Sequence, residues 1–274
     1  MPSLKVFAQQ LLKQMHLYER AKASYLYDLF WRVADKRIIE ARTGEIEFYR
    51  NLLAGFRSGD LIFDIGANQG YKTQIFLQLG AKIVAVDPDE ANQKVLKEKF
   101  LTYRFTKKPV FVVRKAISDR KGSETFWVDE PGSAKNTLNE KWVNILRVDE
   151  NKFGKPLGFR QSVTVETLRL EDLISEYGLP FFVKIDVEGH EAAVLRGLQR
   201  PVPYLSFEVN LPEFKDEGLQ CLELLKRLDP LGRFNCTVDS QTKLAGEDWV
   251  NAEDFQRILK DSRESSIEVF WKTV

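Results

Sequence analysis

The segment "LIFDIGANQG", residues 61–70, decides the fold, because it joins a short apolar run to a loop that contains two glycines. A helical pattern follows the loop, so the segment is typical of a strand–loop–helix unit. A loop of this kind presents unpaired backbone N–H groups together with the positive end of a helix dipole. We therefore expect a polar or anionic ligand at this point of the chain.

Short apolar segments alternate with helical patterns through most of the remaining sequence. This alternation predicts an α/β fold with a doubly wound, mostly parallel sheet and helices on both of its faces. The strands are expected at residues 61–66, 82–87, 109–117, 181–186, 204–209, 233–238 and 266–272. The helices are expected at residues 71–79, 90–101 and 190–198 and near 250–260.

Three parts of the chain depart from this alternation or precede it. Residues 1–57 form a helical extension, with apolar residues at helical spacing over 4–33 and a second amphipathic stretch after Gly44. Residues 58–274 form the main domain. Within it, residues 119–128 are interpreted as a hairpin, and the polar segment 129–162 as a mobile insertion that contacts substrate and buries little apolar surface.

The composition excludes several classes of partner. A formal charge of +1 gives no electrostatic attraction for nucleic acid or for an anionic membrane surface. No apolar run approaches the roughly 20 residues of a transmembrane helix, and no signal-peptide pattern opens the chain. Two cysteines are too few for a disulfide framework, so a cytoplasmic protein is expected. The mixed charges of the N-terminal helices favour a lid or a homodimer contact over lipid.

The acidic residues near the glycine loop indicate which ligand it binds. Gly66 and Gly70 allow close backbone approach, but Asn68 stands where a dinucleotide-binding loop has its central glycine. Asp64 would repel a pyrophosphate and suits the ammonium group of an amino acid. Asp87 ends the next strand, where an acid accepts hydrogen bonds from ribose hydroxyls or caps the following helix. A nucleoside with an amino-acid tail, such as S-adenosylmethionine, satisfies both acids.

Five segments carry a resemblance to a known family: "FDIGANQGYKT" (63–73), "VAVDPDE" (84–90), "KAISDRKG" (115–122), "VETLRLEDLI" (165–174) and "VKIDVEGHEAAVLRG" (183–197). Together they resemble the FkbM family of S-adenosylmethionine-dependent class I methyltransferases, over roughly residues 58–212. The resemblance implies a Rossmann-like sheet of seven strands with the last strand antiparallel. It also implies O-methylation of a hydroxyl on a sugar, glycan or other natural product. The cofactor-binding residues it implies are Asp64, Gly66, Ala67, Asn68, Gly70, Asp87, Pro88, Ala116, Ser118, Asp119 and Asp186.

The segment "FVKIDVEGHE" supplies the catalytic candidates Asp186, Glu188 and His190, which crowd the carboxyl end of a strand. His190 is one hypothesis for the base that removes the acceptor proton, and Asp186 is the competing one. His190 could instead cap the following helix. Lys184 lies within the strand and needs a partner, for which Glu208 on the neighbouring strand is the candidate.

Other interpretations stay open at this stage. Asp186, Glu208 and Asn210 could hold a divalent cation, although no metal is the main expectation. The aromatic residues Phe126, Trp127 and Trp142 could line an acceptor pocket or belong to the core. A nicotinamide-dependent oxidoreductase and a non-catalytic module that only binds S-adenosylmethionine are the two rival functions.

Overall fold

The computed structural model describes residues 36–101, 103, 109–149, 156–238 and 241–274. The helices expected within residues 4–33, and any dimer contact through them, lie outside the described residues. The first described element is helix α4 (Lys36–Leu52), which runs through Gly44 instead of starting after it. A glycine inside a helix costs about 1 kcal/mol, and burial of Tyr49 and Leu52 on this helix offsets that cost.

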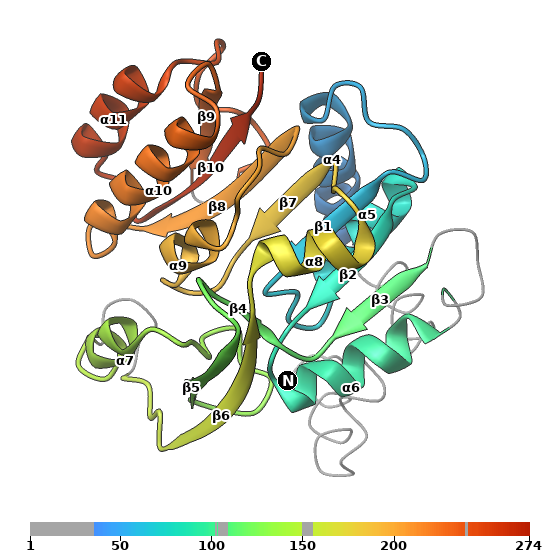
Figure 1. Ribbon diagram of the computed structural model, residues 1–274, viewed down its shortest axis with the longest axis vertical. Coiled ribbons are helices and arrows are strands. Elements are labelled where there is room, and N and C mark those ends of the chain that lie inside the picture. Colours follow the sequence, from blue (N-terminus) through green and yellow to red (C-terminus); the bar gives the residue numbers. More distant parts are fainter. Residues whose placement is uncertain (1–35, 102, 104–108, 150–155, 239–240) are drawn as a thin grey trace.

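The main sheet has seven strands in the order β3-β2-β1-β7-β8-β10-β9 (Figure 1). These strands are β1 (Leu61–Ile65), β2 (Lys82–Val86), β3 (Val110–Val113), β7 (Phe182–Ile185), β8 (Tyr204–Asn210), β9 (Arg233–Val238) and β10 (Ser266–Lys272). β10 pairs antiparallel with both β8 and β9, whereas the other neighbours are parallel. The expected seven-stranded Rossmann-like sheet with its last strand antiparallel is therefore confirmed.

Helices cover both faces of this sheet, because successive side chains of each strand point to opposite sides. Ile62 and Phe182 pack in one apolar cluster with α4, α5 (Tyr71–Leu79) and α6 (Glu90–Lys99). Phe63 and Val183 pack in the other cluster, to which four helices of the main domain contribute. These are α8 (Leu170–Tyr177), α9 (Glu191–Arg196), α10 (Lys215–Leu228) and α11 (Ala252–Asp261). The doubly wound arrangement follows from this alternation.

The hairpin expected at residues 119–128 is wrong. The structure has a second sheet of three strands, to which this segment contributes one strand. β5 (Gly122–Val128) pairs antiparallel with β6 (Gln161–Leu168), and β6 pairs parallel with β4 (Ala116–Ile117). The strand expected over 109–117 is divided between β3 in the large sheet and β4 in the small one. Hairpin patterns specify neighbouring strands only, and here the partner of β5 comes after the whole insertion.

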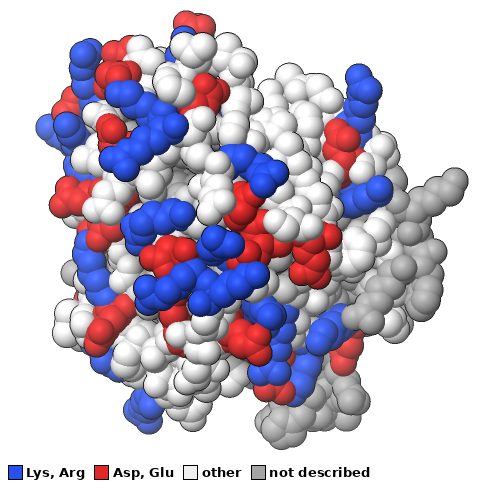
Figure 2. Space-filling model, viewed as in Figure 1, with Lys and Arg blue, Asp and Glu red and all other residues white. Residues whose placement is uncertain are grey.

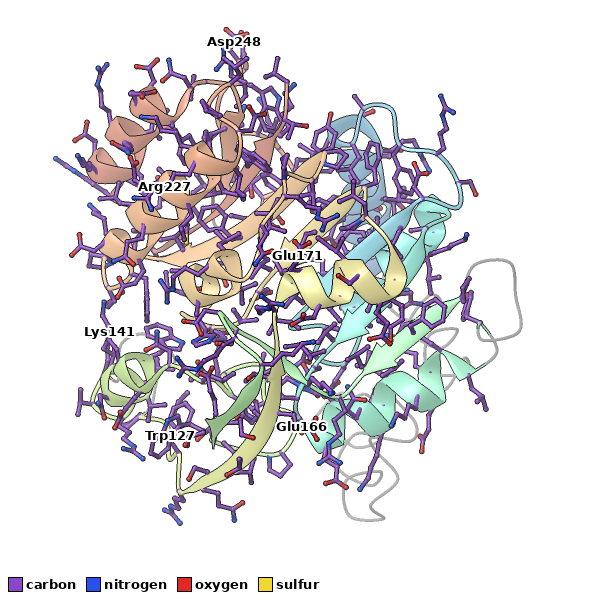
Figure 3. The ribbon with its side chains drawn as sticks, in the orientation of Figure 1. Trp127, Lys141, Glu166, Glu171, Arg227 and Asp248 are labelled. Carbon is purple, nitrogen blue, oxygen red and sulfur yellow. The ribbon has the colours of Figure 1, made fainter. Side chains whose placement is uncertain are left out.

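The insertion also packs more apolar surface than its composition suggests. Helix α7 (Glu140–Leu146) buries Trp142, Val143 and Leu146 on one side, so the expectation that the insertion has little to bury is wrong. On its outer side, Lys141 Nζ lies 2.6 Å from Glu217 Oε1 on α10 (Figure 3). One face of a short helix is enough to anchor this otherwise polar segment.

The surface carries no large area of one charge on the face that Figure 2 shows, where basic and acidic side chains are interspersed.

Across the described ranges, no helix has both the length and the apolar character needed to cross a bilayer. Cys221 and Cys236 are both buried and both free thiols.

Candidate active site

The strand order reverses between β1 and β7, and this reversal places the site. The chain runs from β1 outward through β2 to β3, and from β7 outward on the opposite side through β8. Connections therefore leave the carboxyl ends of β1 and β7 in opposite directions and open a crevice between them, as in other open α/β sheets. Ile65 lies opposite Ile185 in the parallel register, so the loops that start at Gly66 and Asp186 meet there.

Gly66 makes this meeting possible. Its φ is +80°, and a Cβ at this position would lie only 1.7 Å from the carbonyl oxygen of Asp186. Its amide donates a hydrogen bond of 2.9 Å to Val86 O at the end of β2. The close approach that Gly66 allows is therefore between the backbones of the two loops that follow β1 and β7.

A cavity of about 260 Å³ occupies the crevice. The residues expected at the site that line it are Gly66, Asn68, Asp87, Pro88, Ala116, Asp186 and Glu188. Phe126 and Glu208, which were considered for an acceptor pocket and a metal site, also line it. The lining further includes residues that sequence reasoning did not place there, namely Ile65, Val86, Asn92, Lys115, Ile117, Ser133, Ala134, Lys135, Asn136, Leu138 and Val187. The insertion therefore forms one wall of the cavity.

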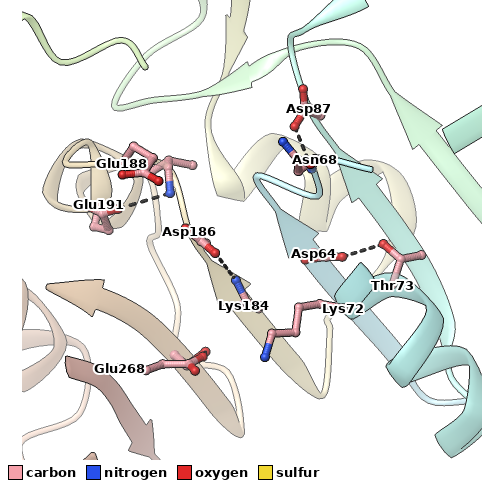
Figure 4. A network of polar contacts seen from close by, with 12 residues as sticks. Asp64, Asn68, Lys72, Thr73, Asp87, Lys184, Asp186, Glu188, Glu191 and Glu268 are labelled. Carbon is pink, nitrogen blue, oxygen red and sulfur yellow. Dashed lines mark hydrogen bonds and ion pairs between the residues drawn. The ribbon is translucent and has the colours of Figure 1, made fainter. Parts of the chain in front are cut away.

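Asp87 organises the loop at the end of β2. Its Oδ2 accepts a hydrogen bond of 2.8 Å from the Asn68 amide, and its Oδ1 accepts from the Asp89 amide at 2.9 Å and from Asn92 Nδ2 at 3.2 Å (Figure 4). Burial raises the pKa of Asp87 to about 7, although these donors act in the opposite direction. The three donors leave part of the carboxylate's acceptor capacity for a ligand in the cavity.

Asp89, not Asp87, caps the next helix and ties the insertion to the site. Its Oδ1 accepts from Ala91 N at 2.7 Å as the N-cap of α6. Its Oδ2 accepts from Gly132 N at 2.9 Å and from Asn136 Nδ2 at 2.7 Å. An acid before a helical pattern signals the cap, but nothing in the sequence signals the contact with residues 132 and 136.

Asp64 lies beside the cavity and not in its wall. Thr73 Oγ1 donates a hydrogen bond of 2.5 Å to Asp64 Oδ2 (Figure 4). Asp64 Oδ1 is buried and has no hydrogen-bond partner in the described part of the chain. Burial raises the pKa of this carboxyl, although the Lys184 ammonium lowers it in part.

Four further expected cofactor residues are absent from the cavity lining. Ala67 is part of the apolar core, and Gly70 is the N-cap of α5 in the left-handed region (φ +76°), with its open side toward Phe100. Ser118 donates a hydrogen bond of 2.6 Å to Glu124 Oε1. Asp119 lies 3.8 Å from the Arg196 side chain. The structure brings none of the four to the cavity wall.

Lys184 finds its partner on its own strand. Its Nζ lies 2.7 Å from Asp186 Oδ2, and the residue opposite Lys184 on β8 is Ser206 (Figure 4). The expected Lys184–Glu208 pair is therefore wrong, because the register places Glu208 two residues further along. Burial alone would raise the pKa of Asp186, but the Lys184 ammonium lowers it below the usual range.

Glu188 is held by the insertion in an unusual backbone conformation, with φ +53°. Its Oε1 accepts from Lys135 Nζ at 3.0 Å, and its Oε2 accepts from Trp142 Nε1 at 2.9 Å. Burial raises the pKa of Glu188, partly offset by Lys135. Of the three aromatic residues considered for an acceptor pocket, Phe126 lines the cavity, Trp142 binds Glu188, and Trp127 packs against the core.

His190 lies outside the cavity lining. It occupies the N-cap position of α9 without capping through its side chain. Its Nε2 lies 3.1 Å from Ser118 Oγ and 3.8 Å from Glu124 Oε2, and burial lowers its pKa. The structure brings Asp186 and Glu188 to the cavity lining and leaves His190 outside it, so a role of His190 as the base stays a prediction.

The structure places two members of the alternative metal set of Asp186, Glu208 and Asn210 in the cavity lining, namely Asp186 and Glu208, and the set stays a prediction. Among the described residues, no group of three or more His, Cys, Asp or Glu side chains is placed to hold a metal ion. Asp186 is instead paired with an ammonium group.

Residues 64–234 match the model of the methyltransferase FkbM domain. The chain belongs to the FkbM methyltransferase family. The matched region contains the cavity, the loops of β1 and β7 and the insertion. Membership of this family supports the methyltransferase interpretation and gives no support to the nicotinamide-dependent alternative.

Two known proteins are similar to this FkbM-family chain. It is 26% identical over 181 residues to the hexuronic acid methyltransferase AglP of Haloferax volcanii, which covers 65% of this chain and 64% of that protein. It is also similar in structure to methyltransferase FkbM from Methylobacillus flagellatus KT, with a TM-score of 0.50 and 14% identity. That similarity covers 81% of this chain and 46% of the other. The chain thus spans less than two thirds of the length of either relative.

Proposed function

We propose that this methyltransferase transfers the methyl group of S-adenosylmethionine to a hydroxyl oxygen of a sugar, glycan or similar natural product. The observation that carries the proposal is the cavity at the reversal of strand order, with Asp87 lining it at the end of β2 and Asp186 and Glu188 lining it at the end of β7. S-adenosylmethionine, when bound, supplies a methyl group that is already activated for displacement.

The residues present fit a nucleoside with an amino-acid tail. Asp87 is placed to accept hydrogen bonds from ribose hydroxyls, and Asn92 beside it adds an amide. Ile117, Phe126 and Leu138 give the cavity an apolar portion suited to a purine ring. Asp64 Oδ1 is a buried acceptor without a hydrogen-bond partner among the described residues, and buried acceptors generally have a donor. The ammonium group of the amino-acid tail could supply this donor through a water molecule.

The reaction asks the protein mainly for positioning. Alignment of acceptor oxygen, methyl carbon and sulfur can account for about 7–11 kcal/mol of barrier lowering. The rigid turn at Gly66 and the anchored Glu188 provide a site whose walls are fixed before the acceptor arrives. The remaining requirement is a group that takes the proton of the acceptor hydroxyl.

The carboxyl groups that line the cavity suit a hydroxylated acceptor. Asp186, Glu188 and Glu208 all line it, and carboxylates accept hydrogen bonds from hydroxyls. The relative that methylates hexuronic acid supports a sugar as the acceptor class, and we assign the methyl group to a hydroxyl of such a sugar.

Calorimetric titration followed by product analysis tests the proposal. The protein should bind S-adenosylmethionine and S-adenosylhomocysteine and should not bind NAD⁺. With S-adenosylmethionine that carries a deuterated methyl group and a set of neutral and uronic-acid glycosides, mass spectrometry should find a labelled product that survives mild base, as an ether does and an ester does not. A base-labile product would be an ester and would show that the methyl group is transferred to a carboxylate. Cofactor binding without any product would favour the alternative function, a non-catalytic module that only binds S-adenosylmethionine.

A further inference from the structure

A second cavity lies on the sheet face that α4 and α5 cover, and it adjoins the first. The two cavities share Asp186 and Glu208 in their linings. The second is otherwise lined mainly by charged and hydroxylated side chains, among them Lys72 from α5, Lys184 from β7 and Glu268 from β10 (Figure 4). A ligand in the second cavity would therefore reach the first at Glu208.

Most charged groups in the second cavity already have partners. Lys72 pairs with Glu45, and Lys184 pairs with Asp186. Glu268 Oε1 accepts a hydrogen bond of 2.9 Å from Ser206 Oγ. The side chain of Glu208, by contrast, has no hydrogen bond or ion pair to any residue in the described ranges. It is the carboxylate at the junction of the two cavities that is left for a ligand.

A second group in this cavity lacks a partner. The hydroxyl of Tyr49, on α4, is buried and has no hydrogen-bond partner among the described residues. Lys184, Glu45 and Glu268, which also line the cavity, are its electrostatic neighbours. Buried polar groups are generally hydrogen-bonded, so the cavity has bonding capacity that a hydroxylated ligand would satisfy.

The other candidates for the base are engaged or distant. Asp186 is paired with Lys184, and its lowered pKa makes it a weak proton acceptor. Both oxygens of Glu188 accept hydrogen bonds from the insertion. His190 lines neither cavity. Glu208 remains as the proton acceptor that faces both the cofactor cavity and the second cavity.

We propose that the reacting hydroxyl of the sugar acceptor enters the second cavity, which has a volume of about 100 Å³, and that Glu208 takes the proton from this hydroxyl. The inference rests on the proposed function and names the acceptor site and the base for it. The O–H bond of the acceptor breaks and its proton passes to the Glu208 carboxylate. The acceptor oxygen forms a bond to the methyl carbon, and the electron pair of the former methyl–sulfur bond stays on sulfur.

The electrostatics of Glu208 suit this role. Burial, together with the carboxylates of Asp186 and Glu188, raises the pKa of Glu208 to about 8. A base must be ionised to act, so the active fraction increases with pH and levels off above this value. Carboxyl groups with pKa values raised toward neutrality are effective proton acceptors near physiological pH.

Glu208→Gln and Glu268→Gln form a matched pair for the test, because the two residues lie opposite each other on β8 and β10 and each change removes one carboxyl group from the same cavity. Glu208→Gln should lower kcat by about 10²–10⁴-fold and abolish the acid limb of the pH–rate profile. Glu268→Gln should change KM for the acceptor and retain that limb. Glu268→Gln, at a residue that lines only the second cavity, should not alter the Kd for S-adenosylmethionine in calorimetry.

Two further variants separate catalysis from structure. Glu208→Asp keeps the charge on a shorter side chain, so it should fold and show a reduced kcat with its acid limb still present. Thr242→Trp, at the exposed rim of the second cavity, should raise KM for the acceptor and leave the cofactor Kd unchanged. If Glu208→Gln does not fold, a kcat of Glu208→Asp equal to that of the wild type would overturn the inference.

The outcomes distinguish this inference from the proposed function. An active wild type whose Glu208→Gln variant keeps its turnover and its acid limb overturns the role of Glu208 alone. An unchanged KM in Thr242→Trp overturns the placement of the acceptor. A wild type that binds S-adenosylmethionine and methylates no sugar overturns the proposed function, and this inference with it.

Discussion

Trp142 Nε1 donates a hydrogen bond of 2.9 Å to Glu188 Oε2, which joins the insertion to the loop after β7. The other oxygen of the same carboxylate accepts from Lys135, also in the insertion. Because Glu188 is buried and its φ is positive, these two donors hold the carboxylate in a conformation that the backbone alone would not favour. The wall of the cavity between β1 and β7 therefore depends on a segment some fifty residues away in sequence.

Trp142→Phe should lower the free energy of unfolding by about 1–3 kcal/mol, because it leaves one oxygen of a buried carboxylate without its donor. Urea unfolding at neutral pH measures the change. Trp127→Phe is the matched control, since the indole of this β5 residue packs against the core and under Arg147 without binding Glu188, so this variant should lose less. Equal losses in the two variants would show that the hydrogen bond to Glu188 contributes nothing specific.

Gly66→Ala should destabilise the fold far more than Gly59→Ala. Both glycines have a positive φ, +80° and +102°, so both variants share the backbone strain. Only at Gly66 does the added Cβ meet the backbone oxygen of Asp186, whereas nothing lies within 4 Å at Gly59. Thermal unfolding without any cofactor is the measurement. Similar melting temperatures for the two variants would contradict the close approach of the β1 and β7 loops.

Asp87→Ala should weaken S-adenosylmethionine binding by about 1–3 kcal/mol, the size of a lost hydrogen bond to a charged group. Calorimetric titration gives the Kd. Asp119→Ala serves as the control, because Asp119 faces Arg196 and does not line the cavity, so its Kd should equal that of the wild type. A control that binds more weakly than Asp87→Ala would reverse the assignment of the two acids.

Asp89→Ala should free the insertion while leaving the sheet intact. The change removes the N-cap of α6 together with the acceptor for Gly132 N and Asn136 Nδ2. Hydrogen exchange in residues 130–142, which we expect to be slow in the wild type, should become faster. Asn251→Ala removes only an N-cap, on α11, and should leave exchange in the insertion unchanged. Fast exchange there in the wild type would restore the picture of a mobile insertion.

The alternation of apolar runs and helical patterns determined the α/β architecture, because local periodicity reports which elements form and which of their faces are buried. "LIFDIGANQG" identified the strand, the loop and the start of α5, since an apolar run, glycines and a helical pattern follow each other along the chain. The acid Asp87 at the end of its strand was found for the same reason. Each of these features is encoded within a few neighbouring residues.

The partners of buried charges were decided by tertiary structure. The sequence placed Lys184 and Glu208 on neighbouring strands, but strand register, which the sequence does not specify, puts Ser206 opposite the lysine. Lys184 pairs with Asp186 instead, and Glu208 is left at the junction of two cavities. A shift of two residues in register thus separates a structural ion pair from a candidate catalytic base.

The role of the insertion was also beyond the sequence. Its polar composition predicts a loose segment, yet Trp142, Lys135 and Asn136 reach Glu188 and Asp89 through contacts that span 46 residues or more. Such contacts depend on where the fold brings distant segments together, and a local pattern carries no record of them. The sequence by itself determined the sheet, the glycine loop and the family. Only the tertiary structure decided which side chains enclose the site, because enclosure is a property of packing between segments that are far apart along the chain.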